Sequence, residues 1–137
     1  MDPVEKALWC IETRFESALS VDEIARVAGV SRFHLTRLFT LLLGQSVMQY
    51  ARARRLTQAA RALADGAPDI LAVALVHGYG SHEAFTRAFR DQFGVTPEQV
   101  RNEGCATKLK LVEPIKLDQL TPLKLADPAF VERGADS

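Results

Sequence analysis

Two segments that lie fifty residues apart carry polar side chains at matching positions. They read SRFHLTRLFTLLLG from Ser31 to Gly44 and SHEAFTRAFRDQFG from Ser81 to Gly94, and both keep a Thr-Arg pair and the final glycine in register. Side chains of these types can donate to guanine or phosphate oxygens, accept from the amino groups of cytosine or adenine, or contact a thymine methyl. The chemistry that the segments could perform is therefore the recognition of hydrogen-bonding groups on a ligand.

The candidate residues lie opposite the apolar stripe of each segment, and they are Arg32, Thr36, Arg37, His82, Glu83, Thr86 and Arg87. Because the two faces differ in composition, they would read different bases. Glu83 would repel phosphate, so at a base edge it should accept from a cytosine amino group or act by exclusion. The arginine that both segments share suits a guanine edge or a phosphate, and its position alone does not decide between them.

The sequence contains no constellation for catalysis or metal binding. There is no nucleophile paired with a base, no HExxH motif and no phosphate-cradling glycine loop. Cys10 and Cys105 are far apart and lack the CxxC spacing of a zinc site. His34 and His77 fit packed or helix-end positions better than metal ligands. We therefore expect no enzyme activity, no metal and no cofactor.

A helix-turn-helix is predicted around the first segment. Apolar residues recur at helical spacing over residues 4–19, which predicts a first helix. Ser20 and Glu23 form a capping box that opens a short second helix, and Gly29 ends it. Ser31 can then cap a third helix that carries the first candidate face.

The same arrangement is predicted around the second segment. Residues 46–64 contain no helix breaker and predict one long helix of about five turns. A short helix, a turn and the second segment follow, and Thr96 with Pro97 begins a last helix. Gly29 matches Gly78 at an offset of 49, whereas the longer segments match at an offset of 50, so the second turn should be one residue longer.

The expected fold class is all-α. Residues 1–104 should form two helix-turn-helix subdomains, at about 4–46 and 68–103, joined by the long linker helix at about 46–64. The tail at 105–137 alternates polar and apolar residues but is interrupted by prolines, so we expect it to be extended. Phe33 belongs either in the core or half exposed against a thymine methyl, and the other aromatic residues expected in the core are Trp9, Phe39, Phe85, Phe89 and Phe93.

The formal net charge is zero, but the charges are unevenly distributed. Residues 1–23 hold six acids and two bases, whereas residues 24–64 hold seven arginines and no acid. Such a block would attract a phosphate backbone. The simpler interpretation is a solvated helix face, since charge runs on helices are often no more than that. The arginines concerned are Arg52, Arg54, Arg55 and Arg61.

The chain resembles the tandem helix-turn-helix domain of AraC/XylS-type transcription regulators. The family signature G-Y-x-S-x-x-x-F-x-R-x-F-x-x-x-F-G-x-T-P is nearly complete from Gly78 to Pro97, and the resemblance covers about residues 4–103. It implies a monomer that places one reading helix in each of two adjacent major grooves. By position it assigns base reading to Arg32, Phe33, Thr36, Arg37, His82, Glu83, Ala84, Thr86 and Arg87. We assign phosphate contacts to Ser31, Arg52, Arg54, Arg55, Arg61, Ser81 and Arg90.

The layout of the chain departs from that of most members of this family. The first helix starts within a few residues of Met1, so we expect none of the N-terminal sensor that most members carry. The layout is closer to that of the stand-alone stress-response activators or of members with a C-terminal effector domain. The tail segment KLKLVEPIKL resembles the first strand of such an effector domain. Because the repeat closes near Arg101, we expect the tail to be dispensable for recognition.

The function predicted from the sequence is that of a sequence-specific regulator that binds double-stranded DNA at an asymmetric two-element site. RNA polymerase is a possible further partner. No apolar run approaches the length needed to span a bilayer, so we expect a cytoplasmic protein that associates with the nucleoid when it is bound to DNA. The alternative is a helical protein-interaction module whose basic block binds an acidic protein partner without reading DNA. A binding preference for one duplex over random duplex at matched salt distinguishes the two.

Overall fold

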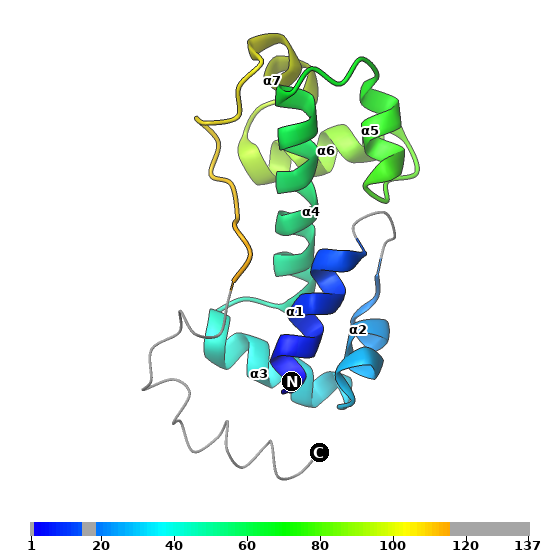
Figure 1. Cartoon of the computed structure of the whole chain (residues 1–137), viewed down its shortest axis with the longest axis vertical. Coiled ribbons are helices and arrows are strands. Elements are labelled where there is room, and N and C mark those ends of the chain that lie inside the picture. Colours follow the sequence, from blue (N-terminus) through cyan, green and yellow to red (C-terminus); the bar gives the residue numbers. More distant parts are fainter. Residues whose placement is uncertain (1, 15–18, 116–137) are drawn as a thin grey trace. The chain divides into compact units, whose positions relative to one another are not determined.

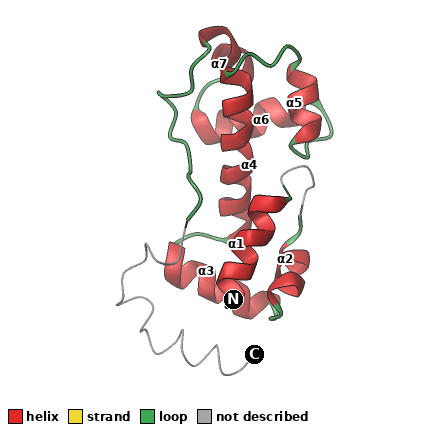
Figure 2. Ribbon diagram, in the orientation of Figure 1, coloured by secondary structure: helices red, strands yellow, loops and turns green. Residues whose placement is uncertain are grey.

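The fold is entirely helical in the part of the chain that the structure describes. The computed structural model describes residues 2–14 and 19–115, which contain seven α-helices and no strand (Figure 1, Figure 2). The predicted all-α fold class is confirmed. None of these helices is both long enough and apolar enough to cross a bilayer. The helices are α1 (Pro3–Thr13), α2 (Val21–Ala28), α3 (Arg32–Leu43), α4 (Val47–Ala64), α5 (Ile70–Val76), α6 (His82–Phe93) and α7 (Pro97–Glu103).

The described residues fall into two compact units. Unit 1 holds residues 2–13, 19–51 and 114–115, and unit 2 holds residues 14 and 52–113. Helix α4 begins in unit 1 and ends in unit 2, so one uninterrupted helix belongs to both. The structure thus confirms the long helix that the sequence predicts.

Each unit has a core built from the apolar stripes of its helices. In unit 1, α1 packs on α2 and α3, and the ring of Phe39 on α3 lies 6.2 Å from that of Tyr50 on α4. In unit 2, Phe85 and Phe89 of α6 are fully buried, with ring centroids 5.6 Å apart. These aromatic residues join a cluster that also contains Leu56, Leu63, Ile70, Val73 and Val100.

The repeat seen in the sequence corresponds to equivalent backbone hydrogen bonds in two turns of the structure. The turn after α2 is closed by a bond from Val30 N–H to the Ala25 carbonyl at 3.1 Å, and the turn after α5 by the equivalent bond from Tyr79 N–H to Ala74 at 2.9 Å. The longer helices α3 and α6 both end on a left-handed glycine, Gly44 at φ 69° and Gly94 at φ 77°. A residue with a side chain is strained at such a φ, which explains why both segments close on glycine.

The first part of the tail packs on unit 2. We call residues 105–113 the strap; they contain neither helix nor strand and run beside α4 (Figure 1). Ala106 is buried in the core of unit 2, and Leu109 and Leu111 pack against that core. The N–H of Val112 donates to Thr57 Oγ1 at 2.9 Å. The sequence predicted an extended tail, but not that its beginning would complete a core.

Two expectations drawn from apolar spacing need correction, and a third is decided between its alternatives. Helix α1 ends at Thr13, although the pattern predicts a helix over residues 4–19; of these, residues 15–18 lie outside the described ones. Trp9 is 53% exposed, because it lies beside the stripe of α1 that is buried. Phe33 is 77% exposed and so takes the exposed alternative. The other aromatic residues follow the expectation, with Phe39, Phe85 and Phe89 buried and Phe93 half-buried.

Candidate nucleic-acid interface

The first candidate surface is the outward face of α3 in unit 1. Ser31 caps the helix by accepting a hydrogen bond from His34 N–H at 3.1 Å. Arg32 Nη1 lies 3.7 Å from Asp22 Oδ2, and both side chains are more than half exposed, so this pair leaves Arg32 available to a ligand. The buried stripe of α3 faces the core, and its exposed face carries all four residues that the sequence assigned to base reading on this helix: Arg32, Phe33, Thr36 and Arg37.

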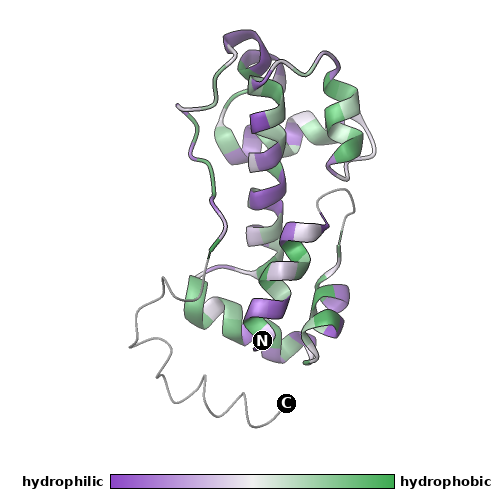
Figure 3. Ribbon diagram, in the orientation of Figure 1, coloured by the Kyte–Doolittle hydropathy of each residue, from purple (hydrophilic) through white to green (hydrophobic). Residues whose placement is uncertain are grey.

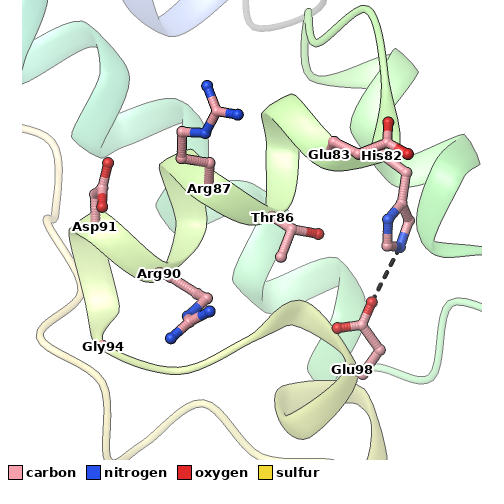
Figure 4. Close-up of a pocket in the computed structure, with 8 residues that line it drawn as sticks. All are labelled: His82, Glu83, Thr86, Arg87, Arg90, Asp91, Gly94 and Glu98. Atoms are coloured by element: carbon pink, nitrogen blue, oxygen red, sulfur yellow. Dashed lines mark ion pairs between the residues drawn. The ribbon is translucent and has the colours of Figure 1, made fainter.

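The second candidate surface is the corresponding face of α6 in unit 2. Ser81 caps this helix as Ser31 caps α3, by accepting from Ala84 N–H at 3.1 Å. An open hollow of about 560 Å³ runs along the helix (Figure 4). The structure therefore brings the polar candidates of this helix together around one concave surface, which is lined by His82, Glu83, Thr86, Arg87, Arg90 and Asp91.

Two residues of α6 can offer less to a base than their positions suggest. Ala84 is exposed but carries only a methyl group, so it can contribute apolar contact alone. Thr86 is half-buried, and its Oγ1 is buried with no hydrogen-bond partner among the described residues. A base contact from Thr86 would therefore have to use its methyl group, as threonine does against a thymine methyl.

Glu98 is a residue of this surface that sequence reasoning missed. It lies in the first turn of α7, and its Oε1 is 3.0 Å from Nε2 of His82 (Figure 4). Glu98 also lines the hollow. In the sequence it appears only as a favourable acid at a helix start, after Thr96 and Pro97. Its contact with His82 depends on how α7 packs against α6, which no local sequence pattern predicts.

The arginines of α4 do not form the single exposed face that the sequence predicted. Arg52 is exposed, and Arg55 is half-buried, with its guanidinium 5.1 Å from the ring centre of Tyr79. Arg61 forms an ion pair with Glu113 of the strap. Arg54 is only 1% exposed, and its Nη1 donates to the carbonyl of Val112.

The assignment of Arg54 to a phosphate contact is therefore wrong. The strap covers this side chain and satisfies it with a backbone carbonyl, so its guanidinium does not face solvent. Arg61 still has a side chain that is 37% exposed, but Glu113 already neutralises part of its charge. Of the four arginines, Arg52 is the one that this structure leaves exposed and so most open to a phosphate.

The environment of Tyr79 also differs from that of a surface tyrosine. Burial raises the pKa of the Tyr79 phenol, and the nearby positive charge of Arg55 opposes this rise. The ring packs against Phe85 at 5.4 Å, at the turn that leads into α6. Tyr79 therefore stays neutral near pH 7. Its ring holds the guanidinium of Arg55 by a cation–π contact, close to the start of α6.

These observations define a class of protein. Two capped helices that follow turns closed by equivalent hydrogen bonds, each with an apolar stripe inside and a polar face outside, form a tandem helix-turn-helix domain of the kind that reads DNA. Residues 24–103 match the family described as a helix-turn-helix domain. The fold is similar to that in a crystal structure of an AraC-type transcriptional regulator from Chromobacterium violaceum, with a TM-score of 0.70. The two sequences are 32% identical, and the match covers 75% of this chain and 92% of that one.

Curated relatives agree with this assignment. The chain is 37% identical over 114 residues to the transcriptional regulator Rob of Salmonella typhimurium, which covers 83% of this chain but 39% of Rob. It is 32% identical over 105 residues to the multiple antibiotic resistance protein MarA of Escherichia coli, covering 77% of this chain and 83% of MarA. The chain belongs to the AraC-type helix-turn-helix family of DNA-binding transcription regulators.

Proposed function

We propose that this chain reads an asymmetric DNA site with two helices, α3 in one major groove and α6 in the next, and so directs the transcription of nearby genes. The observation that carries the proposal is the equivalence of the two outward faces. Both begin at a capping serine, and both present an arginine at the same place, Arg37 on α3 and Arg87 on α6. Successive major-groove exposures on one face of DNA come every ~34 Å, which suits a protein with two such units.

The composition of the two faces supports two different half-elements. The face of α3 combines exposed arginines with the exposed ring of Phe33, which suits guanine next to thymine. The face of α6 combines His82 and Glu83 with Arg87, which suits a mixture of amino and carbonyl groups. A site with two unlike halves needs no second copy of the protein, so a monomer should fill it.

Phosphate contacts would hold the two helices in register. Ser31 and Ser81 lie at helix starts, where free N–H groups favour anions, and Arg90 lies on the rim of the α6 hollow. Arg52 is exposed on α4 and adds a further positive charge. These contacts supply affinity, whereas the base-facing residues supply the choice of sequence.

We infer that the chain acts by binding, as expected of a member of a family of transcription regulators. As an activator it would also contact RNA polymerase. Helix α5 supports such a contact: its ribbon is coloured largely as hydrophobic (Figure 3), and Leu71, Leu75 and Val76 are exposed on it. In the repeat, Leu71 and Leu75 correspond to the charged residues Asp22 and Arg26 of α2. The repeat itself therefore does not require an apolar face on α5. The cytoplasm, where the bacterial chromosome lies, is the expected place of action.

A selection from random duplex DNA, followed by sequencing, tests the proposal. We expect a site of two unlike elements about one helical turn apart, bound at least ~10³ times more tightly than random duplex at the same salt concentration. Enrichment of a palindrome bound by a dimer would contradict the proposed geometry. Equal affinity for all duplexes would favour the alternative function, a module that binds an acidic protein partner.

Replacing either shared arginine should weaken specific binding by a similar amount. Arg37→Ala and Arg87→Ala should each cost about 1–3 kcal/mol, the value expected for one bidentate base contact or one strong phosphate contact. Fluorescence anisotropy with the selected duplex measures the loss. Lys110→Ala, which removes one positive charge from an exposed position of the strap, is the matched control and should leave the affinity nearly unchanged. An effect of Arg37→Ala alone would mean that α6 does not enter a groove.

The salt dependence of binding should separate the arginines of α4. The wild-type slope should correspond to about 4–8 phosphate contacts. Arg52→Ala should flatten the slope by up to about 1 and leave the preferred site unchanged. Arg54→Ala should leave the slope unchanged but lower the stability, because Arg54 is covered by the strap. Equal slopes for the wild-type protein and Arg52→Ala would show that Arg52 does nothing more than solvate the helix.

A further inference from the structure

The contact between His82 and Glu98 bears on the position of the His82 ring and also on which ring nitrogen carries the hydrogen. The two residues come from different helices of unit 2, α6 and α7, and their side chains are 44% and 38% exposed. The bond joins Nε2 of the imidazole to Oε1 of the carboxylate at 3.0 Å. His82 is thus held at the wall of the hollow by one nitrogen, while its Nδ1 forms no hydrogen bond within the described residues (Figure 4).

The chemistry of the two groups decides which nitrogen carries the hydrogen. An ionised carboxylate has no hydrogen to donate and can only accept. Nε2 must therefore be the nitrogen that carries N–H when His82 is neutral, and Nδ1 then keeps a lone pair. Without such a partner, a neutral histidine can adopt either tautomer and can offer a ligand either a donor or an acceptor at the same place.

We propose that Glu98 is a specificity-determining residue, because it holds neutral His82 in the tautomer whose free nitrogen accepts a hydrogen bond from a base amino group. This inference rests on the proposed function, in which His82 faces the major groove. Adenine N6 and cytosine N4 are the amino donors exposed there, whereas guanine and thymine offer carbonyl oxygens. His82 should therefore select adenine or cytosine on the strand that it contacts.

The charged neighbours of His82 act on the affinity for DNA without setting this preference. Glu83, Arg87, Arg90 and Asp91 line the same hollow, and the dashed contact in Figure 4 joins His82 to Glu98. The charges of Arg90 and Asp91 raise or lower the attraction of any duplex to the hollow, whatever its sequence, whereas Glu83 and Arg87 contact bases other than the one that faces His82. The hydrogen bond that Glu98 accepts differs from these charge effects, because it decides that Nε2 of His82 is the nitrogen that carries the hydrogen.

Two substitutions at position 98 separate the placing of the ring from the choice of tautomer. In Glu98→Gln, the amide can accept from Nε2–H through its oxygen or donate to a bare Nε2 through its nitrogen, so the ring stays in place but both tautomers become available. In Glu98→Ala, the ring loses its partner altogether. His82→Ala identifies the base pair that His82 contacts, and Asp91→Asn is a control that removes a carboxylate from the same hollow.

The experiment measures the affinity of each variant at pH 8 for four duplexes that differ at the base pair identified by His82→Ala. For the wild-type protein we expect adenine or cytosine to be preferred by about 3- to 10-fold, the range of one neutral hydrogen bond. Glu98→Gln should reduce this preference to less than about twofold while binding the other bases more tightly. Asp91→Asn should change all four affinities by one common factor.

Two outcomes would overturn the inference while leaving the proposed function intact. The first is specific binding in which no base pair responds to His82→Ala. The second is an unchanged base preference in Glu98→Gln, which would mean that the carboxylate does no more than support the ring. Failure of the wild-type protein to prefer any duplex would instead overturn the proposed function, and this inference with it.

Discussion

Insertion of five base pairs between the two half-elements of the selected site should reduce specific binding on the order of a hundredfold or more. The insertion turns one half-element to the opposite face of the DNA, because a helical turn contains about ten base pairs. The segment that joins the two units through α4 is an uninterrupted helix over Val47–Ala64, and we expect such a helix not to follow the displaced half-element as a flexible linker would. The contacts of one reading helix are then lost, and each good base contact contributes about 1–3 kcal/mol.

The control is a spacer of the original length with a scrambled sequence, which should bind as the selected site does. Electrophoretic mobility shifts at fixed salt measure both duplexes side by side. The duplex with the insertion should bind no more tightly than one in which a half-element has been replaced by random sequence. Binding that is indifferent to the insertion would show that the two helices do not engage DNA together.

Removal of the tail after Gly104 should destabilise unit 2 by about 2–4 kcal/mol, which is a large share of the ~5–15 kcal/mol of a typical domain. The truncation takes Ala106, Leu109 and Leu111 away from the core, and it removes the carbonyl that accepts from Arg54. Lost apolar burial and a lost hydrogen bond to a charged group together account for this magnitude. Urea unfolding followed by circular dichroism measures the change.

The matched control is a chain that ends at residue 115, which keeps the whole strap and the bond from Ile115 N–H to the Tyr50 hydroxyl at 3.0 Å. It should unfold at the same urea concentration as the full chain. This expectation revises the one drawn from the sequence, in which everything after the last helix was dispensable for recognition. A chain of residues 1–104 that is as stable as the full chain would mean that the strap contacts contribute nothing.

The helices and their order could be predicted because their signals are local. Ser20 and Glu23 form the predicted capping box, and Gly44 ends a helix as glycine does at positive φ. The outward faces of α3 and α6 followed from the same periodicity, since a stripe of buried residues fixes the opposite side of a helix. The sequence alone therefore predicts which side chains lie on the outward faces of α3 and α6, and their role in reading DNA stays a prediction.

The contacts of the strap could not be predicted in this way. Arg54 and Val112 are 58 residues apart, and nothing adjacent to Arg54 distinguishes it from Arg52. One signal was present but needed the structure to explain it. Hydrogen-bonding side chains recur along α4 at helical spacing, and each of them has a partner among residues 112–115; they are Tyr50, Arg54, Thr57 and Arg61.

Side chains of α4 provide most of the specific groups that hold the strap, whereas the strap provides mainly main-chain groups. Arg54 and Thr57 bind the carbonyl and the N–H of Val112, which are main-chain groups that every amino acid except proline provides in full. The attachment therefore depends little on which side chain stands at position 112. A change of side chain at position 112 should therefore leave the strap bound to α4, so this attachment tolerates variation in sequence on the side of the strap.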